Sequence, residues 1–340
     1  METVKSVLLL TVALLFGLAG TPDIIRGQSN QPKGKNYYAA VFLNRGQVTG
    51  GGARTVGFFR RVPGDTTWTN LYQPSLLTFG MGIWQKGATL RQYLSMGNGL
   101  HRSDDGGRTW RVLTDWHTEE VLSVALDPRD SALIYIATPF GVFKSTDDGT
   151  HWTKKMAGMK KWFVKRLLLD HADPNILYAG AEDDLYRSTD RGEHWTPLHV
   201  GVQCIEVVVQ HPSDSKRLLV GTEDDGLRVT TDGGRTWNTG KGLPKTAIYG
   251  LCASSDGSTM YAGGYRTGLW KSYDGGLSWG PLWPGSDIEA IFTIFIDPED
   301  PLHLMIGTSG QGIFESRDGG TTWLFAGLRG CHVKQIDLYP

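Results

Sequence analysis

Short apolar runs alternate with turn residues along most of the chain. Residues 121–126 (VLSVAL) and 133–137 (LIYIA) are two such runs, and a third begins at residues 142–144 (VFK). Asp, Pro and Gly residues separate them. Short β-prone runs bounded by these turn residues predict the strands of an antiparallel meander. A fourth strand is expected to begin at Trp152, which completes a four-stranded unit.

This four-strand pattern recurs with tryptophan in a fixed register. The spacings between tryptophans 68, 110, 152, 195, 237, 279 and 323 are 42, 42, 43, 42, 42 and 44 residues. A period of about 40–45 residues predicts a β-propeller with one four-stranded blade for each repeat. The last six tryptophans end the motif Ser/Thr-x-Asp-x-Gly-x-x-Trp, and residues 61–68 (RVPGDTTW) are a degraded copy.

The Asp–Trp turn, as we call each copy of this motif, is predicted to join the third and fourth strands of a blade. Its aspartate can accept hydrogen bonds from backbone amides. Its glycine, Gly107 in the first copy, can adopt a positive φ, and its tryptophan can pack between blades. We therefore expect a structural role for Asp105, Asp147, Asp190, Asp232, Asp274, Asp318, Trp110, Trp152, Trp195, Trp237, Trp279 and Trp323.

The two ends of the repeat predict how the ring closes. Residues 332–340 (HVKQIDLYP) match the inner-strand register of residues 121–128. Residues 37–43 match a second strand and residues 56–60 a third, so the first blade lacks an inner strand that the C-terminus can supply. We predict an all-β fold, a single seven-bladed propeller of four-stranded antiparallel blades over residues 37–340.

The N-terminus has the pattern of a secretory signal peptide. Lys5 precedes an apolar and small-residue run at residues 7–20, and Gly17 and Ala19 suit a cleavage site. The run is short for a membrane span. We expect a signal peptide at 1–19, a polar, flexible lead-in at 20–36 and export to the periplasm or out of the cell. Alternatively, an uncleaved anchor or a membrane-bound partner could hold the protein at the membrane.

Composition narrows the classes of function. The 340 residues carry a net charge of −1, which gives no electrostatic basis for nucleic-acid binding. Cys204, Cys252 and Cys331 are too few and too widely spaced for a disulfide framework. The histidines form no close-spaced metal set, and each Asp–Trp turn offers only one regular carboxylate, so calcium is not required. We expect no cofactor and no metal.

Propeller ligands usually meet the face built from two kinds of loop around the central channel. These loops join the fourth strand of one blade to the first of the next, and the second strand to the third. The glycine-rich residues 45–54 are the longest of them. Aromatic residues in these loops would anchor a partner, and charges would set its register. The candidate contact residues are Trp116, Lys161, Trp162, Asp183, Asp224, Tyr265 and Arg266.

The Asp–Trp turn resembles the Asp-box, or BNR repeat. Families with this repeat include sialidases, xyloglucan-degrading hydrolases, sortilin-type receptor domains and the photosystem II assembly/stability factor. In them the box lies on the outer rim, away from the ligand face. The architecture is most similar to the assembly/stability factor, a single exported seven-bladed propeller. The resemblance implies a non-catalytic binding or assembly scaffold, or an outer-side subunit of a membrane complex, with a protein partner.

A glycoside hydrolase that acts on carbohydrate is the alternative. Residues 182–184 (EDD) and 223–225 (EDD) place carboxylates on adjacent blades, and glycoside hydrolysis needs two carboxylates at a defined separation. Residues 59–63 (FRRVP) are similar to the sialidase motif whose arginine binds a carboxylate. The xyloglucan-degrading families use a cleft between two propellers, whereas this sequence predicts one.

Overall fold

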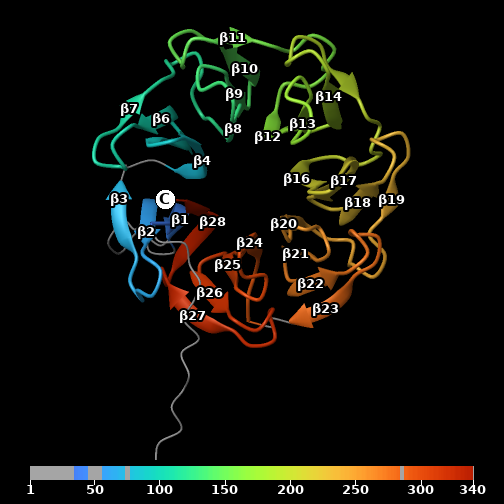
Figure 1. The fold of residues 1–340 in the computed structure, drawn as a ribbon. Helices are drawn as coiled ribbons and strands as arrows, with labels where there is room; N and C mark the ends of the chain where they lie inside the picture. The colour runs from blue at the N-terminus through green and yellow to red at the C-terminus, as the bar shows by residue number, and fades with distance from the viewer. Residues whose placement is uncertain (1–33, 45–55, 73–76, 284–286, 340) are drawn as a thin grey trace, which may run out of the picture.

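The computed structural model describes the chain over residues 34–44, 56–72, 77–283 and 287–339. The expected signal peptide at 1–19, most of the lead-in at 20–36 and the glycine-rich loop at 45–54 lie outside the described residues. The described strands form seven four-stranded antiparallel sheets arranged in a ring (Figure 1). The inner strands of the ring line a central channel. The predicted seven-bladed propeller is therefore confirmed. The described part of the chain contains no helix that could cross a membrane.

Each blade is an antiparallel meander, written here from the channel outward. Blades 1 to 3 are β28 (Cys331–Tyr339), β1 (Asn36–Asn44), β2 (Gly57–Arg61) and β3 (Thr69–Tyr72); β4 (Thr78–Lys86), β5 (Thr89–Met96), β6 (Gly99–Ser103) and β7 (Arg111–Val112); and β8 (Ser123–Leu126), β9 (Ile134–Thr138), β10 (Gly141–Ser145) and β11 (Thr153–Lys154).

Blades 4 and 5 are β12 (Val164–Leu169), β13 (Leu177–Ala181), β14 (Leu185–Ser188) and β15 (Thr196–Pro197); and β16 (Ile205–His211), β17 (Asp214–Thr222), β18 (Leu227–Thr230) and β19 (Asn238–Thr239). Blades 6 and 7 are β20 (Ile248–Ala253), β21 (Met260–Gly264), β22 (Leu269–Ser272) and β23 (Gly280–Trp283); and β24 (Ile291–Ile296), β25 (Leu304–Thr308), β26 (Ile313–Ser316) and β27 (Leu324–Gly327).

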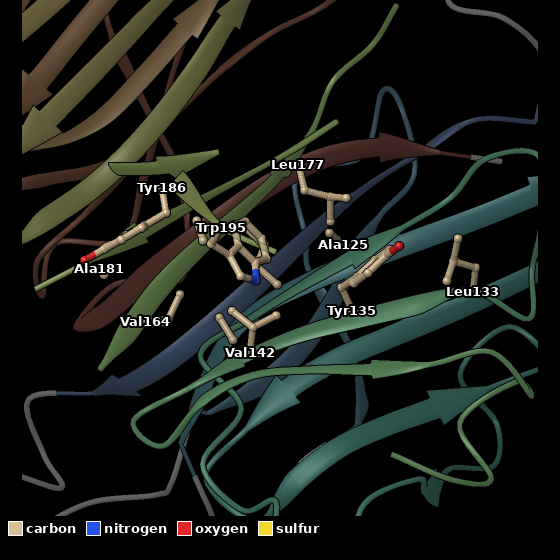
Figure 2. Close-up of a cluster of buried hydrophobic side chains, with 12 residues drawn as sticks. Ala125, Leu133, Tyr135, Val142, Val164, Leu177, Ala181, Tyr186 and Trp195 are labelled. Carbon is tan, nitrogen blue, oxygen red and sulfur yellow. The ribbon is translucent and has the colours of Figure 1, made fainter. Parts of the chain in front are cut away.

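The core lies between the blades rather than in one central body. Among the described residues, seven apolar clusters fill the seven interfaces between neighbouring blades. In the cluster drawn in Figure 2, Tyr135 and Val142 of blade 3 meet Leu177, Tyr186 and Trp195 of blade 4. Because both faces of a blade are covered, every residue of β9 and β13 is buried. The sequence of these strands is accordingly apolar throughout rather than alternating.

The C-terminal strand closes the ring, as predicted. β28 pairs antiparallel with β1, from Asn36 opposite Tyr339 to Asn44 opposite Cys331. Its Val333, Ile336 and Leu338 are buried in the cluster between blades 7 and 1. The first and last described strands are therefore neighbours in one sheet (Figure 1).

The six Asp–Trp turns lie at the end of the blades opposite the candidate loop face. In all six, the Ser or Thr hydroxyl donates to the aspartate and accepts from the glycine amide of the motif. In the turn after β18, Thr230 Oγ1 donates to Asp232 Oδ1 at 2.7 Å and accepts from the Gly234 amide at 3.0 Å. Asp232 Oδ1 also accepts from the amides of Arg235 and Thr236, both at 2.9 Å. These bonds hold the chain reversal between the third and fourth strands, and Gly234 adopts a φ of 90° there.

The tryptophans of these turns form two kinds of hydrogen bond. Trp68, Trp152, Trp195 and Trp237 donate from Nε1 to a carbonyl of the preceding blade, at 2.8 to 3.1 Å. Trp110, Trp279 and Trp323 instead donate to a glycine carbonyl of their own turn. The first group therefore joins neighbouring blades directly, whereas the second reinforces the turn.

Candidate binding site

β-bulges in the inner strands direct side chains into the channel. β4, β12, β16, β20 and β24 each show a register shift that skips one residue near the start of the strand. A bulge leaves the extra residue outside the ladder and re-aims its side chain. The skipped residues are Phe79, Lys165, Glu206, Tyr249 and Phe292.

Blade 1 contributes two more skipped residues. The two shifts in the β1–β28 ladder leave Lys334 and Phe42 without a paired residue. All seven skipped residues line one cavity of about 280 Å³, which we call the channel mouth. A second cavity of about 320 Å³, the channel interior, continues from it and shares the lining residues Leu122, Arg166, Tyr249, Phe292 and Lys334.

The channel mouth combines aromatic rings with charged groups. Lys165 forms an ion pair with Glu206, and Arg166 Nε donates to the Glu206 carbonyl oxygen at 2.8 Å. Lys334 Nζ lies 3.5 Å from the ring centroid of Phe292 and 5.3 Å from that of Phe42. The channel mouth can therefore contact both apolar and charged parts of a ligand.

Two groups at the channel mouth have displaced pKa values. Burial, with repulsion from Arg166 and Lys165, lowers the pKa of the Lys334 ammonium to about 7, although Glu206 opposes this. Burial, with the nearby charges of Glu206, Glu223 and Asp224, raises the pKa of Tyr249 to about 12. Lys334 is therefore poised to change charge near neutral pH.

Three of the predicted contact residues, Trp116, Trp162 and Tyr265, are exposed aromatics on the loop face. Trp116, in the loop from β7 to β8, is 74% exposed, and Trp162, in the loop from β11 to β12, is 63% exposed. Sequence reasoning missed two exposed rings in loops of the same face, Phe140 in the β9–β10 turn and Phe163 next to Trp162. We call Trp116, Phe140, Trp162 and Phe163 the aromatic arc. Phe163 also lines the channel mouth.

Tyr265 and the remaining predicted contact residues lie on separate parts of the same face. Lys161 is exposed beside Trp162. Tyr265 and Arg266 lie in the β21–β22 loop of blade 6, with the Arg266 guanidinium 5.1 Å from the Tyr265 ring centroid. Asp183 accepts from the Tyr186 hydroxyl at 2.7 Å, and Asp224 is exposed. The seven residues therefore share a face but do not form one cluster.

The acidic loops of blades 4 and 5, residues 182–184 and 223–225, each contribute one glutamate to a shared cavity. Glu182 and Glu223 line one cavity of about 280 Å³ with Phe163 and Cys204. Asp184 accepts from the amides of Leu185 at 2.8 Å and Val200 at 3.0 Å. Asp184 therefore fastens the loop, whereas Glu182 and Glu223 face a common space.

The second arginine of the FRRVP segment, Arg61, is buried inside the fold. Arg61 Nη1 lies 2.8 Å from Glu315 Oε2, and its guanidinium lies 5.0 Å from the Tyr37 ring centroid. Its side chain is 5% exposed. Arg61 therefore stabilises the interface between blades 7 and 1 instead of facing a ligand. In the described segments, no three His, Cys, Asp or Glu side chains are grouped to hold a metal ion.

The fold and its channel define a seven-bladed β-propeller. The chain belongs to the family described as the DUF6242 beta propeller domain, which matches residues 123–327. No curated protein matches the sequence.

Solved structures similar to this chain include an enzyme, an extracellular domain and a propeller bound to a peptide. The GH74 enzyme of Niastella koreensis matches with a TM-score of 0.61 and 22% identity over 73% of this chain and 44% of that chain. The extracellular domain of the one component system BT4673 from B. thetaiotaomicron gives 0.62 and 15%, over 82% and 38%. YCF48 bound to D1 peptide gives 0.55 and 17%, over 72% and 79%.

These similarities show the fold alone. The chain spans less than half the length of the GH74 and BT4673 structures, and about four fifths of the YCF48 chain. What each of those proteins does is therefore not transferred by the match, and the function must be argued from the residues of this chain.

Proposed function

We propose that this protein is an exported, non-catalytic binding or assembly scaffold that holds a protein partner on its loop face. The observation that carries the proposal is the aromatic arc, in which exposed rings on loops of consecutive blades lead to the channel mouth. Exposed aromatic groups of this kind mark interaction surfaces, and aromatic anchors dominate the energy of protein interfaces.

The charges of the channel mouth support binding rather than hydrolysis. Glu206, a carboxylate that lines this cavity, is held in an ion pair with Lys165. The YCF48 structure, which was solved with a D1 peptide, supports the proposal as a propeller of similar fold that binds a peptide. The signal-peptide pattern at 1–19 supports a periplasmic or secreted location, and a membrane complex on its outer side is a suitable partner.

The Asp–Trp turns are proposed to be Asp-boxes. Their shared motif supports this identification, and so do the hydrogen bonds of the hydroxyl and the aspartate, which hold the turn. The turns lie at the end of the blades opposite the aromatic arc. A structural role for Asp105 and its counterparts is therefore part of the proposal.

One observation favours a glycoside hydrolase as the second candidate. Glu182 and Glu223 line the same cavity, so two carboxylates from adjacent blades meet one space. Hydrolysis of a glycoside needs a general acid and a partner carboxylate. The fold similarity to the GH74 enzyme is compatible with this reading.

The scaffold is tested by quantitative capture from the cell envelope. Purified protein with both Trp116→Ala and Trp162→Ala is compared with wild type, using Tyr273→Ala as the control because Tyr273 is 73% exposed in an Asp–Trp turn on the opposite face. We expect the double substitution to weaken capture of the wild-type partner by at least about tenfold, as aromatic hot spots do. Equal capture by wild type and the double variant would refute the loop face as the interface.

The hydrolase is tested on sialylated and β-glucan substrates. We expect no turnover by the wild-type protein. Turnover that disappears in Glu182→Gln and Glu223→Gln, but persists in Asp224→Asn, would replace the scaffold with the enzyme.

A further inference from the structure

The channel interior carries positive charge without a balancing carboxylate. Arg166 and Lys334 are the charged residues among those that line this cavity. Of the carboxylates at the channel mouth, Glu206 is paired with Lys165 and Glu120 is exposed at its outer edge. Within the described residues, neither Lys334 nor Arg166 forms an ion pair with a carboxylate. An anion that entered the channel would therefore meet unpaired cations.

Aromatic rings line the channel mouth together with these two cations. Phe42 and Phe79 have ring centroids 5.3 Å apart, and Tyr249 and Phe292 have centroids 5.4 Å apart. The Lys334 ammonium lies against the Phe292 ring rather than against an acid. Such rings stabilise a cation and also offer an apolar wall to a ligand.

The channel interior also holds an unused polar group. Ser95 is fully buried and lines this cavity. Its hydroxyl has no hydrogen-bond partner among the described residues. A buried hydroxyl without a partner is costly, so a ligand atom that completed its bonding would be favoured.

We propose that the channel binds a small organic anion with one carboxylate attached to an aromatic or branched apolar group. The carboxylate lies between Lys334 and Arg166, and the apolar group packs against Phe42, Phe79 and Phe292. The channel interior and the channel mouth, of about 320 Å³ and about 280 Å³, are each near the small end of the range of small-molecule sites. Two cations, one of them easily neutralised, suit a monoanion better than a phosphate dianion. The site adjoins the aromatic arc, because Phe163 also lines the channel mouth, but it uses different residues to hold the anion.

Protons and the anion are coupled at this site. With a pKa of about 7, the Lys334 ammonium is charged below neutral pH and largely neutral above it. The groups that face it are Arg166, Lys165 and Glu206, with Tyr249 and Glu120 also lining the channel mouth. A bound carboxylate favours the charged form, so binding above pH 7 takes up a proton and is weaker than binding below pH 7.

Calorimetric titration of the full-length protein with phenylacetate tests the site. Phenylacetamide, which has the same shape without the charge, is the matched ligand. Lys334→Met removes the ammonium but keeps an apolar stem, and Lys86→Met removes an exposed lysine at the far end of β4. We expect phenylacetate to bind wild type and Lys86→Met with similar affinity. Phenylacetamide should bind wild type at least about tenfold more weakly, and phenylacetate should bind Lys334→Met at least about tenfold more weakly.

The pH dependence gives a second readout. Phenylacetate affinity of the wild type should fall between about pH 6 and about pH 8.5 with net proton uptake, and that of Lys334→Met should change little. N-acetylphenylalanine distinguishes a peptide C-terminus from a free acid. If it binds more tightly than phenylacetate, the site is assigned to the C-termini of peptides. If it binds more weakly, the site is assigned to free small acids. Equal affinity for phenylacetate and phenylacetamide in the wild type, or no binding of either carboxylate, would overturn the proposal without any variant.

Discussion

At the scale of single residues, the hydroxyl at the start of each Asp–Trp turn is a strong determinant of stability. Thr230 is fully buried, and its Oγ1 bonds both Asp232 and the Gly234 amide. Thr230→Val keeps the shape but leaves that buried amide without its acceptor. We expect a loss of about 1–3 kcal/mol in the free energy of unfolding, measured by urea titration. Thr230→Ser, the residue of the other five turns, should lose far less; equal losses would mean that packing and not the hydroxyl matters.

Glu315 makes the interface between blades 7 and 1 sensitive to acid. Burial would raise its pKa, but a hydrogen bond from His303 and the charges of Arg61 and Arg317 lower the pKa from 4.5 to about 2. The unfolded chain therefore takes up a proton at this group near pH 4.5, whereas the folded chain does so only near pH 2. The stabilisation is complete above pH 4.5 and is lost as pH falls through 2.

Denaturant titrations across this range test Glu315. Its pH-dependent contribution is on the order of 3 kcal/mol. We expect Glu315→Gln to be less stable than wild type at neutral pH, because two arginines lose their shared partner. The difference in the free energy of unfolding between wild type and Glu315→Gln should narrow by about this pH-dependent contribution between about pH 5 and about pH 2. A difference in stability between wild type and Glu315→Gln that stays constant over this pH range would contradict the assignment.

At the scale of strands, spacing predicted the elements well but not the bulges. The tryptophan register gave the four-strand unit, the seven blades and the strand supplied by the C-terminus, and the structure confirms each. Side chains of a strand alternate between the two faces of the sheet, so a sequence pattern assigns each residue to a face. One extra residue at a bulge reverses this alternation for the residues that follow. Lys165 and Glu206 therefore read as ordinary strand residues although they line the channel.

A sequence signal for the channel mouth does exist. The second residue of five inner strands is Phe79, Lys165, Glu206, Tyr249 or Phe292, each large or charged and each preceded by Thr, Val or Ile. Each of these residues lies 30 or 31 positions before the tryptophan of its own blade. The exposed rings of the aromatic arc are harder to predict, because a loop sequence does not show which of its side chains is exposed. Trp116 and Trp162 were identified from the sequence, but Phe140 and Phe163 were not.

At the scale of the whole molecule, the propeller depends on a closed ring, since its core is divided among interfaces that each need two blades. Removing residues 333–340 would delete Val333, Ile336 and Leu338 and uncover Tyr37, Phe295 and Met305 in the cluster that they fill. Burial of each large apolar side chain contributes about 1.5–3 kcal/mol, and β1 would become an open edge strand. We expect the truncated chain to aggregate or to lose its single cooperative thermal transition.

A circular permutant separates the loss of closure from a general effect of shortening the chain. Tyr339 and Asn36 are paired at one end of the β1–β28 ladder, so a two-residue hairpin turn can join them. A chain that begins at Cys331, runs through Tyr339 into Asn36 and ends at Gly330 keeps every blade but turns β28 and β1 into an ordinary hairpin. Because closure and not chain order stabilises the ring, this permutant should melt cooperatively within a few degrees of wild type, as followed by circular dichroism. A truncated chain that melts as cooperatively as the permutant would show that six complete blades and an open seventh are sufficient.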